Sequence, residues 1–300
     1  MADRSPRSRP LRLALAANAA FSAGCGLFLF VDGAGLLATS GPAASAVMRG
    51  LGVMLIGFAA LVAATALRPR PGVAAAIALL DVGWVAATLP LAAVPGLLTG
   101  EGRQAVVAVA MAVGAFAVAQ LAGLRLMMRD GSAGGHAYRH CLRIRADAPA
   151  GAVWAVVADL GRIERFSPAL ARSGLRGGEA AGLGAVRDCA DRRGSQWSEE
   201  VVAFDPAGRR LVLRFLADAP GFPFPVAAMT GGWRVEPDGA GSWVEVWWSF
   251  APRGRFGWIL LALMTLALDH SARGIVGRMA MAARGGPVGR PRRGPAWSYC

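Results

Sequence analysis

The sequence predicts a chain in two parts: a membrane all-α four-helix bundle, and a soluble α+β domain whose antiparallel sheet curls around a long C-terminal helix. Three observations lead to this prediction. Hydrophobic residues make up 55% of the 300 residues, and their excess lies before residue 130. After residue 135 the pattern changes from long apolar runs to strand-like alternation. A glycine-rich linker, residues 131–136, separates the two patterns.

Four apolar stretches in residues 1–130 are the candidate membrane spans. Each reaches the ~20 residues that a helix needs to cross a ~30 Å hydrocarbon core. Short connections with turn-forming residues separate them. Arginines precede the first stretch, and Ala17-Asn18-Ala19 within it resembles a signal-peptide cleavage site. We expect an uncleaved span, because few apolar residues precede that site and apolar sequence continues well past it. The four stretches lie at roughly 11–31, 46–67, 73–94 and 104–126.

The arginines predict the orientation of the bundle. They gather before the first stretch, in the second connection and after the fourth stretch, whereas the first and third connections have Arg103 as their main basic residue. By the positive-inside rule, both termini are then cytoplasmic, and an even number of spans agrees with this. Residues 131–300 are therefore expected in the cytoplasm.

Three polar residues interrupt the apolar stretches: Asn18, Asp81 and Gln120. From a rise of ~1.5 Å per residue, all three lie roughly 4–8 Å to the cytoplasmic side of the span centres. We therefore expect an intramembrane polar cluster. It either holds the helices together by hydrogen bonds or forms a proton or solute site.

Charge and cysteines limit the partners. All 32 basic residues are arginine and the net charge is +13, which suits nucleic acid or anionic lipid. The apolar half favours lipid, and no nucleic-acid-binding motif is present. The four cysteines, Cys25, Cys141, Cys189 and Cys300, lie far apart without a CxxC pair. We expect unpaired thiols, no metal site and no cofactor.

The second half predicts strands and two helices. Residues 138–144 alternate, with Tyr138, His140, Leu142 and Ile144 on one face. A helix with proline at its start follows, with Val153, Trp154 and Val157 at helical spacing. Strands are expected at 183–191, 196–205, 209–217, 226–236 and 241–251, and a long helix at 255–284. This element order is α+β.

The two halves resemble different families. "LALAANAAFSAGCGLFLF", "DVGWV" and "QLAGLRLM" in residues 11–129 resemble an uncharacterised family of four-helix bacterial membrane proteins, which implies a bacterial inner membrane and no known activity. "APAGAVWAVVADLGRIERFSP", "GLGAVRD", "EEVVAFDPAGRRLVLRF", "FPFP" and "GSWVEVWWSFAP" in residues 137–284 resemble the START/Bet v 1-like (SRPBCC) superfamily, in the polyketide cyclase/dehydrase and lipid transport branch. This second resemblance implies a helix-grip fold that binds hydrophobic small molecules or lipids.

Candidate pocket residues come from this fold. Val244, Val246, Trp248 and Phe250 share one face of a strand, opposite Trp243, Glu245 and Trp247, and both faces are aromatic, so the sequence leaves open which face looks inward. Glu199 and Arg187 lie at positions that resemble a recurrent Glu and Arg of the family; they pair internally, form a surface salt bridge or anchor the polar end of a ligand. No histidine–carboxylate or metal-ligand spacing indicates catalytic residues. The remaining candidates are Trp154, Phe166, Trp197 and Trp233.

Two C-terminal segments complete the predictions. The apolar stretch 256–268 is too short to span a membrane; we expect it to line the domain interior, with an added contact to membrane or a second copy left open. Residues 285–300 are predicted to be a disordered tail, and the arginines at 284, 290, 292 and 293 suit the anionic inner leaflet.

These features favour a membrane-anchored cytoplasmic protein that holds, presents or senses a hydrophobic or lipid-like molecule. The first alternative is a cyclase or dehydratase acting on a membrane-soluble substrate. The second is a small transporter or coupling module regulated by the soluble domain. A homo-oligomer stays open, and no nucleic-acid partner is expected.

Overall fold

The computed structural model describes residues 6–39, 41–131, 137–178, 181–289 and 294–300. The chain divides into two compact units on either side of the Met127–Met128 bond. Most of the predicted linker, 132–136, and the arginines at 290, 292 and 293 lie outside the described residues.

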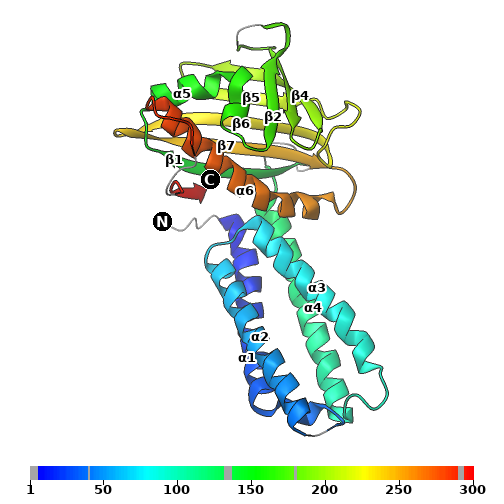
Figure 1. Ribbon diagram of the computed structural model, residues 1–300. Coiled ribbons are helices and arrows are strands. Elements are labelled where there is room, and N and C mark those ends of the chain that lie inside the picture. Colours follow the sequence, from blue (N-terminus) through cyan, green and yellow to red (C-terminus); the bar gives the residue numbers. More distant parts are fainter. Residues whose placement is uncertain (1–5, 40, 132–136, 179–180, 290–293) are drawn as a thin grey trace. The chain divides into compact units, whose positions relative to one another are not determined.

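Four long helices make up most of the N-terminal unit, and Figure 1 shows them running alongside one another. They are α1 (Arg9–Asp32), α2 (Pro42–Leu67), α3 (Pro71–Ala92) and α4 (Gly100–Met128). Proline occupies one of the first two positions of α1, α2 and α3, where its missing N–H is not needed and its fixed φ favours a helix. Small residues allow close packing between α1 and α2: a Cβ at Gly52 would lie 2.6 Å from the carbonyl oxygen of Gly26.

Many large apolar side chains of this unit point outward, although Leu11, Leu15, Ile77 and Leu124 are buried. Leu27, Val31, Met54, Met111 and Val118 are exposed, whereas the interior contains mostly small residues such as Ala59, Ala74 and Ala78. Hydrocarbon solvates such a surface and water does not. The described residues contain five helices long and apolar enough to cross a membrane: these four, and a fifth in the C-terminal unit.

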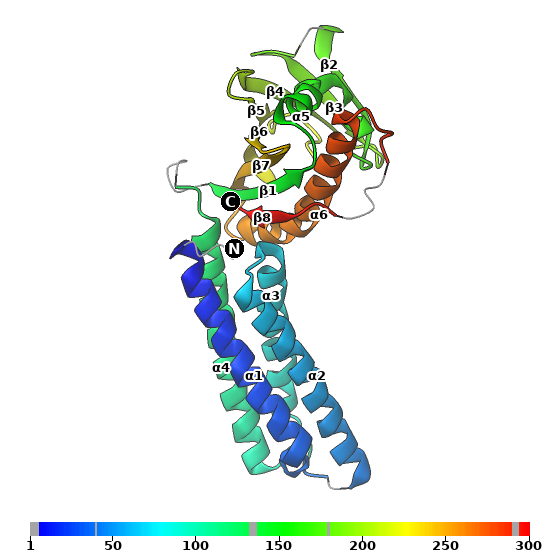
Figure 2. The same ribbon diagram turned by 90° about the vertical axis from the view of Figure 1, so that its left-hand side faces the viewer.

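The C-terminal unit is an eight-stranded antiparallel sheet with two main helices. The strands lie in the order β2-β3-β4-β5-β6-β7-β1-β8. The sheet curves, and α6 (Gly257–Ala283) runs along its inner face (Figure 2). A shorter helix, α5, spans Ala150–Ala158. The strands are β1 (Tyr138–Ala146), β2 (Leu170–Leu175), β3 (Val186–Asp191), β4 (Gln196–Asp205), β5 (Arg210–Phe215), β6 (Val226–Asp238), β7 (Gly241–Pro252) and β8 (Trp297–Tyr299).

Alternation along the strands places the core between the sheet and the helices. Tyr138, His140, Leu142 and Ile144 of β1 are all buried, which confirms the predicted face. Leu142 and Ile144 pack with Val153 of α5 and Val276 of α6. The predicted architecture is thus confirmed: apolar helices, then an antiparallel sheet with a long C-terminal helix.

Helix α6 buries one side only. Leu261, Ala262, Thr265 and Ala272 are buried in the domain, while the side bearing Phe256, Leu260 and Leu266 is exposed. The helix therefore reaches the length and hydropathy of a membrane span while serving as the inner helix of the sheet.

The C-terminal unit contains two strands that were not predicted from the sequence. Strand β2 was not predicted, because Leu170–Leu175 ("LARSGL") has only a weak alternating pattern. The predicted disordered tail contains β8, which pairs with β1 through Leu142–Tyr299 and Ile144–Trp297. The Gly/Pro/Arg content that indicated disorder belongs to residues 285–296, and the aromatic residues after it supply the missing apolar contacts.

Candidate ligand-binding site

The inner face of the sheet is defined by burial along β7. Val244, Val246 and Phe250 are buried, and Trp248 packs with the same interior. Trp243, Glu245 and Trp247 lie on the outer face, where their register partners in β1 are the arginines Arg145 and Arg143 and the cysteine Cys141. The structure therefore selects the Val244–Phe250 face as the inward one.

The apolar and aromatic residues predicted for the pocket fall into two groups, and Arg187 and Glu199 form a third. Trp154, Phe166, Trp233, Val244 and Val246 belong to a sealed core that also holds Leu142 and Val276. Trp154 contacts Phe204 with ring centroids 5.8 Å apart. These five residues belong to the larger of the two buried apolar clusters of the domain.

The other group lies in a second apolar cluster, called here the aromatic cluster. Its buried members are Val226, Met229, Phe250 and Leu261. Around them pack side chains that are only partly buried: Phe215, Phe222, Phe224, Trp248, Met264 and Leu268. Trp197 joins the cluster edge-on to Phe224, with centroids 5.6 Å apart. Because these rings are incompletely covered, this end of the inner face offers apolar surface to a ligand.

A buried charged group adjoins the aromatic cluster. Arg187 on β3 and Glu199 on β4 form an ion pair, and both side chains are about 95% buried. The Trp197 Nε1–H donates to Glu199 Oε1 at 2.7 Å. Arg187 also donates to the Leu160 carbonyl oxygen at 3.3 Å. The structure thus brings together three of the predicted residues, and Trp197 connects the charged group to the apolar one.

The charges of this group are fixed by their surroundings. Burial opposes the charged guanidinium, but the Glu199 carboxylate outweighs it, so the pKa of Arg187 is raised. Burial, followed by the negative charge of Glu199, raises the pKa of the neighbouring Cys189 thiol to about 12. The group is therefore a neutralised pair beside a protonated thiol. Nε of Arg187 has no hydrogen-bond partner among the described residues.

A second buried polar group was missed from the sequence. His140 Nε2 of β1 lies 2.7 Å from Asp269 Oδ1 of α6, and the Tyr299 hydroxyl of β8 donates to Asp269 Oδ2 at 2.6 Å. His140 is 2% exposed and stacks on Trp248 with centroids 6.2 Å apart. The spacing of residues 140, 269 and 299 along the sequence does not indicate contact. A histidine on the apolar face of a strand, however, does indicate a buried imidazole that needs a polar partner.

The cysteine prediction is wrong for two of the four cysteines. Cys141 of β1 and Cys300, beside β8, form a disulfide, while Cys25 and Cys189 are free. The register opposes residues 141 and 300, because Leu142 pairs with Tyr299. Sequence separation of 159 residues hid this pairing.

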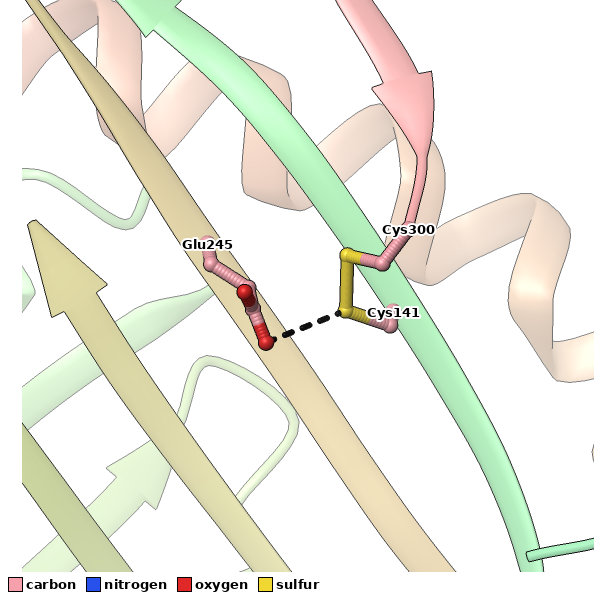
Figure 3. A group of neighbouring side chains, drawn as sticks. All are labelled: Cys141, Glu245 and Cys300. Carbon is pink, nitrogen blue, oxygen red and sulfur yellow. Dashed lines mark hydrogen bonds between the residues drawn. A yellow bond between two sulfur atoms is a disulfide. The ribbon is translucent and has the colours of Figure 1, made fainter. Parts of the chain in front are cut away.

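Glu245 lies beside the disulfide (Figure 3). Its Oε1 is 3.6 Å from Cys141 Sγ, the pair joined by the dashed line. Donor atoms of Cys141, Glu245 and Cys300 lie within 4.8 Å of one another. The two sulfurs are bonded to each other, so neither is a thiolate, and a metal ion would need the reduced form.

A groove on the outer face of the sheet has a different character. Its volume is about 520 Å³. None of the predicted pocket residues lines it, and its polar and charged walls do not suit an apolar ligand. The lining residues are Asp130, Arg139, Arg210, Thr230, Arg234, Glu245, Trp247 and Ser249.

In the helical unit, the structure brings Asn18, Asp81 and Gln120 together. Asn18 Nδ2 donates to Asp81 Oδ2 at 2.8 Å, and Gln120 Nε2 donates to the same oxygen at 2.9 Å. Ser22 donates to Asn18 Oδ1 at 3.1 Å. Oε1 of Gln120 has no hydrogen-bond partner in the described part of the chain.

Comparisons with known proteins concern the C-terminal unit. Residues 142–284 match the family described as polyketide cyclase / dehydrase and lipid transport. No curated protein matches the chain.

Three similar solved structures each cover about half of the chain. The Zhui aromatase/cyclase of a Streptomyces species is 21% identical and covers 51% of this chain and 100% of its own, with a TM-score of 0.42. A norcoclaurine synthase of Thalictrum flavum is 15% identical and covers 49% and 96%, with a TM-score of 0.41. A protein of Thermobifida fusca is 22% identical and covers 50% and 97%, with a TM-score of 0.39. The similarity of this chain to the polyketide cyclase / dehydrase and lipid transport family thus lies in residues 142–284.

Proposed function

We propose that the protein is a membrane-anchored binding protein that holds, presents or senses a hydrophobic small molecule at the cytoplasmic face of the inner membrane. The observation that carries the proposal is the aromatic cluster, whose rings are only partly buried and which adjoins the Arg187–Glu199 pair through Trp197. An apolar wall with a few fixed polar groups is the usual composition of a small-molecule site.

The anchoring part of the proposal rests on the helical unit. Large apolar side chains on its outer surface and helices of 22 to 29 residues suit a hydrocarbon environment. Arginines at residues 68 and 70, between α2 and α3, and at 125 and 129 favour cytoplasmic termini. A domain held beside the bilayer is close to its source of apolar ligand.

The proposal is tested by native mass spectrometry of the full chain purified in mild detergent. We expect a discrete bound mass on the wild type. Trp197→Ala and Phe224→Ala remove apolar surface from the aromatic cluster, and we expect each to reduce the bound fraction at least tenfold.

Trp243→Ala is the matched control. It removes a tryptophan from the outer face, where its ring packs under Arg143, and we expect it to retain the bound mass. Equal adducts on all variants, or no adduct on any, would contradict the binding proposal. Protease accessibility of residues 137–289 in inverted and right-side-out vesicles tests the cytoplasmic placement separately.

A further inference from the structure

We propose that Cys141 and Cys300 are a reversible thiol–disulfide modification site, reduced by a dithiol of the thioredoxin class, and that the disulfide holds β8 over the His140–Asp269 pair. The proposal rests on the proposed function in one respect, the cytoplasmic placement of the domain. In a reducing compartment, disulfides are usually transient and catalytic or redox-sensing.

The disulfide fastens a short strand at the edge of the sheet. β8 contains three residues and pairs on one side only, with β1, at the end of the sheet. Main-chain hydrogen bonds from Arg145 N to Ala296 O at 2.8 Å and from Cys300 N to Cys141 O at 3.4 Å flank the pairing. So short an edge strand gains little from its own pairing, so the covalent bond acts together with the side-chain contacts of Trp297 and Tyr299 to keep it in place.

Strand β8 covers the buried pair of His140 and Asp269. Tyr299 supplies one of the hydrogen bonds to Asp269, and its ring lies 5.6 Å from the His140 ring. Trp297 lies against Arg273, whose guanidinium carbon is 5.1 Å from the indole centroid. Both aromatic residues also pack on the sealed core. Departure of β8 removes a donor from Asp269 and a covering ring from His140 at the same time.

The sulfurs are accessible to a reductant. Cys300 is exposed and Cys141 is half-buried on the outer face of the sheet. A thiolate of the dithiol attacks one sulfur, breaks the protein S–S bond and forms a mixed disulfide, and the second thiol of the reductant resolves it. The dithiol is oxidised to its disulfide. Its two electrons and two protons are transferred to the protein sulfurs, so that Cys141 and Cys300 become thiols.

Glu245 favours the reduced form. Its Oε1 lies 3.6 Å from Cys141 Sγ and 3.3 Å from Arg139. A reduced Cys141 can donate its S–H to this carboxylate, whereas a disulfide sulfur has no proton to donate. The reduced state therefore gains a hydrogen bond that the oxidised state lacks.

The test uses the full chain in detergent with EDTA present. Thiols are counted by maleimide-polyethylene glycol after denaturation, before and after dithiothreitol, and we expect dithiothreitol to add two. Carbethoxylation by diethyl pyrocarbonate is then followed by peptide mass spectrometry. We expect the His140 rate to rise at least tenfold on reduction, with exposed His270 as internal control, and diamide oxidation to reverse the rise.

Variants keep the test independent of the reductant. Cys300→Ser should give the fast His140 rate without dithiothreitol, whereas Cys25→Ser should behave as the wild type. Tyr299→Phe keeps the disulfide and loses only the bond to Asp269, so its His140 rate should stay within threefold of the oxidised wild type. Absence of the disulfide in air-oxidised protein, or an unchanged His140 rate after its reduction, would overturn the proposal.

Acid-quenched alkylation of intact cells tests whether the site is reversible in place. A change in the oxidised fraction after a diamide pulse, followed by recovery, is the expected result. A pair that stays fully oxidised throughout would make the bond a permanent structural link and overturn the modification site. Loss of the bound mass in the native spectra would instead overturn the proposed function alone.

Discussion

The indole N–H of Trp197 donates to Oε1 of Glu199 at 2.7 Å, while the other carboxylate oxygen of Glu199 pairs with Arg187. One buried carboxylate therefore pairs with the Arg187 guanidinium and accepts a hydrogen bond from the Trp197 indole at the edge of the aromatic cluster. A change at Glu199 acts on both the stability of the domain and the geometry of the candidate site.

Glu199→Gln is predicted to destabilise the domain by about 3–5 kcal/mol, because it leaves a buried guanidinium without its counter-charge. Urea unfolding followed by tryptophan fluorescence measures the loss. Glu200→Gln is the matched control: it breaks an exposed pair with Arg214 and should cost less than about 1 kcal/mol. Recovery of stability in the double variant Arg187→Met/Glu199→Gln would confirm that the unpaired charge is the cause. Equal losses of stability in Glu199→Gln and Glu200→Gln would contradict it.

Cys189 is predicted to be unreactive in the folded protein. Its pKa is raised to about 12, so at pH 8 the thiolate fraction is on the order of 10⁻⁴. Iodoacetamide at pH 8 should modify Cys189 only after denaturation. Since the folded pKa is raised, the native state loses stability as pH rises from about 9 toward about 12. Cys189→Ala should weaken this alkaline loss, and rapid native alkylation would refute the assignment.

Asp81 is predicted to stabilise the helical unit through hydrogen bonds rather than charge. Asp81→Ala removes the acceptor of Asn18 and Gln120 and should cost about 1–3 kcal/mol for two contacts. Asp81→Asn keeps an acceptor and can donate to the unpartnered Gln120 Oε1, so it should cost less than half as much. Thermal unfolding in detergent compares them, with Thr88→Ala as control. A loss of transport or coupling in Asp81→Asn at unchanged stability would favour the proton or solute site.

Gly52 is predicted to be intolerant of any side chain. A Cβ there would meet the carbonyl oxygen of Gly26 at 2.6 Å and the backbone nitrogen of Phe30 at 2.8 Å. Gly52→Leu must therefore separate α1 from α2 and should cost about 1–3 kcal/mol or more. Gly50→Leu, two residues earlier with open space around its Cβ position, should change stability by less than about 0.5 kcal/mol. Circular dichroism during thermal unfolding distinguishes the two.

Periodicity predicted the elements that bury a continuous apolar face. Four apolar stretches correspond to α1–α4, and the predicted strand at 196–205 coincides with β4. Alternation could not tell which face of β7 looks inward, because tryptophans lie on both faces. The outer tryptophans are covered by arginines: Arg139 lies 4.7 Å from the Trp247 ring centroid, and Arg143 lies 5.3 Å from that of Trp243. Such long-range cation–π contacts leave no local pattern in the sequence.

The residues of the candidate site were likewise predictable only in part. Family resemblance singled out Arg187 and Glu199 but left their role open, and the β3–β4 register places them directly opposite each other. The His140–Asp269–Tyr299 group could not be found, since its members come from β1, α6 and β8 and meet only through tertiary packing. The disulfide was missed because the composition before β8 indicated disorder, and that hid the one strand that brings Cys300 to Cys141.

The bond between Cys141 and Cys300 also makes the domain a covalent ring. Its ends are joined across 159 residues, and this ring encloses every helix of the C-terminal unit and all of its strands except the first residues of β1. A single proteolytic cut anywhere inside the ring therefore opens it without releasing a fragment, because the two pieces stay joined through the disulfide. On a gel without reductant such a nicked protein keeps its full mass, and only reduction separates the two pieces.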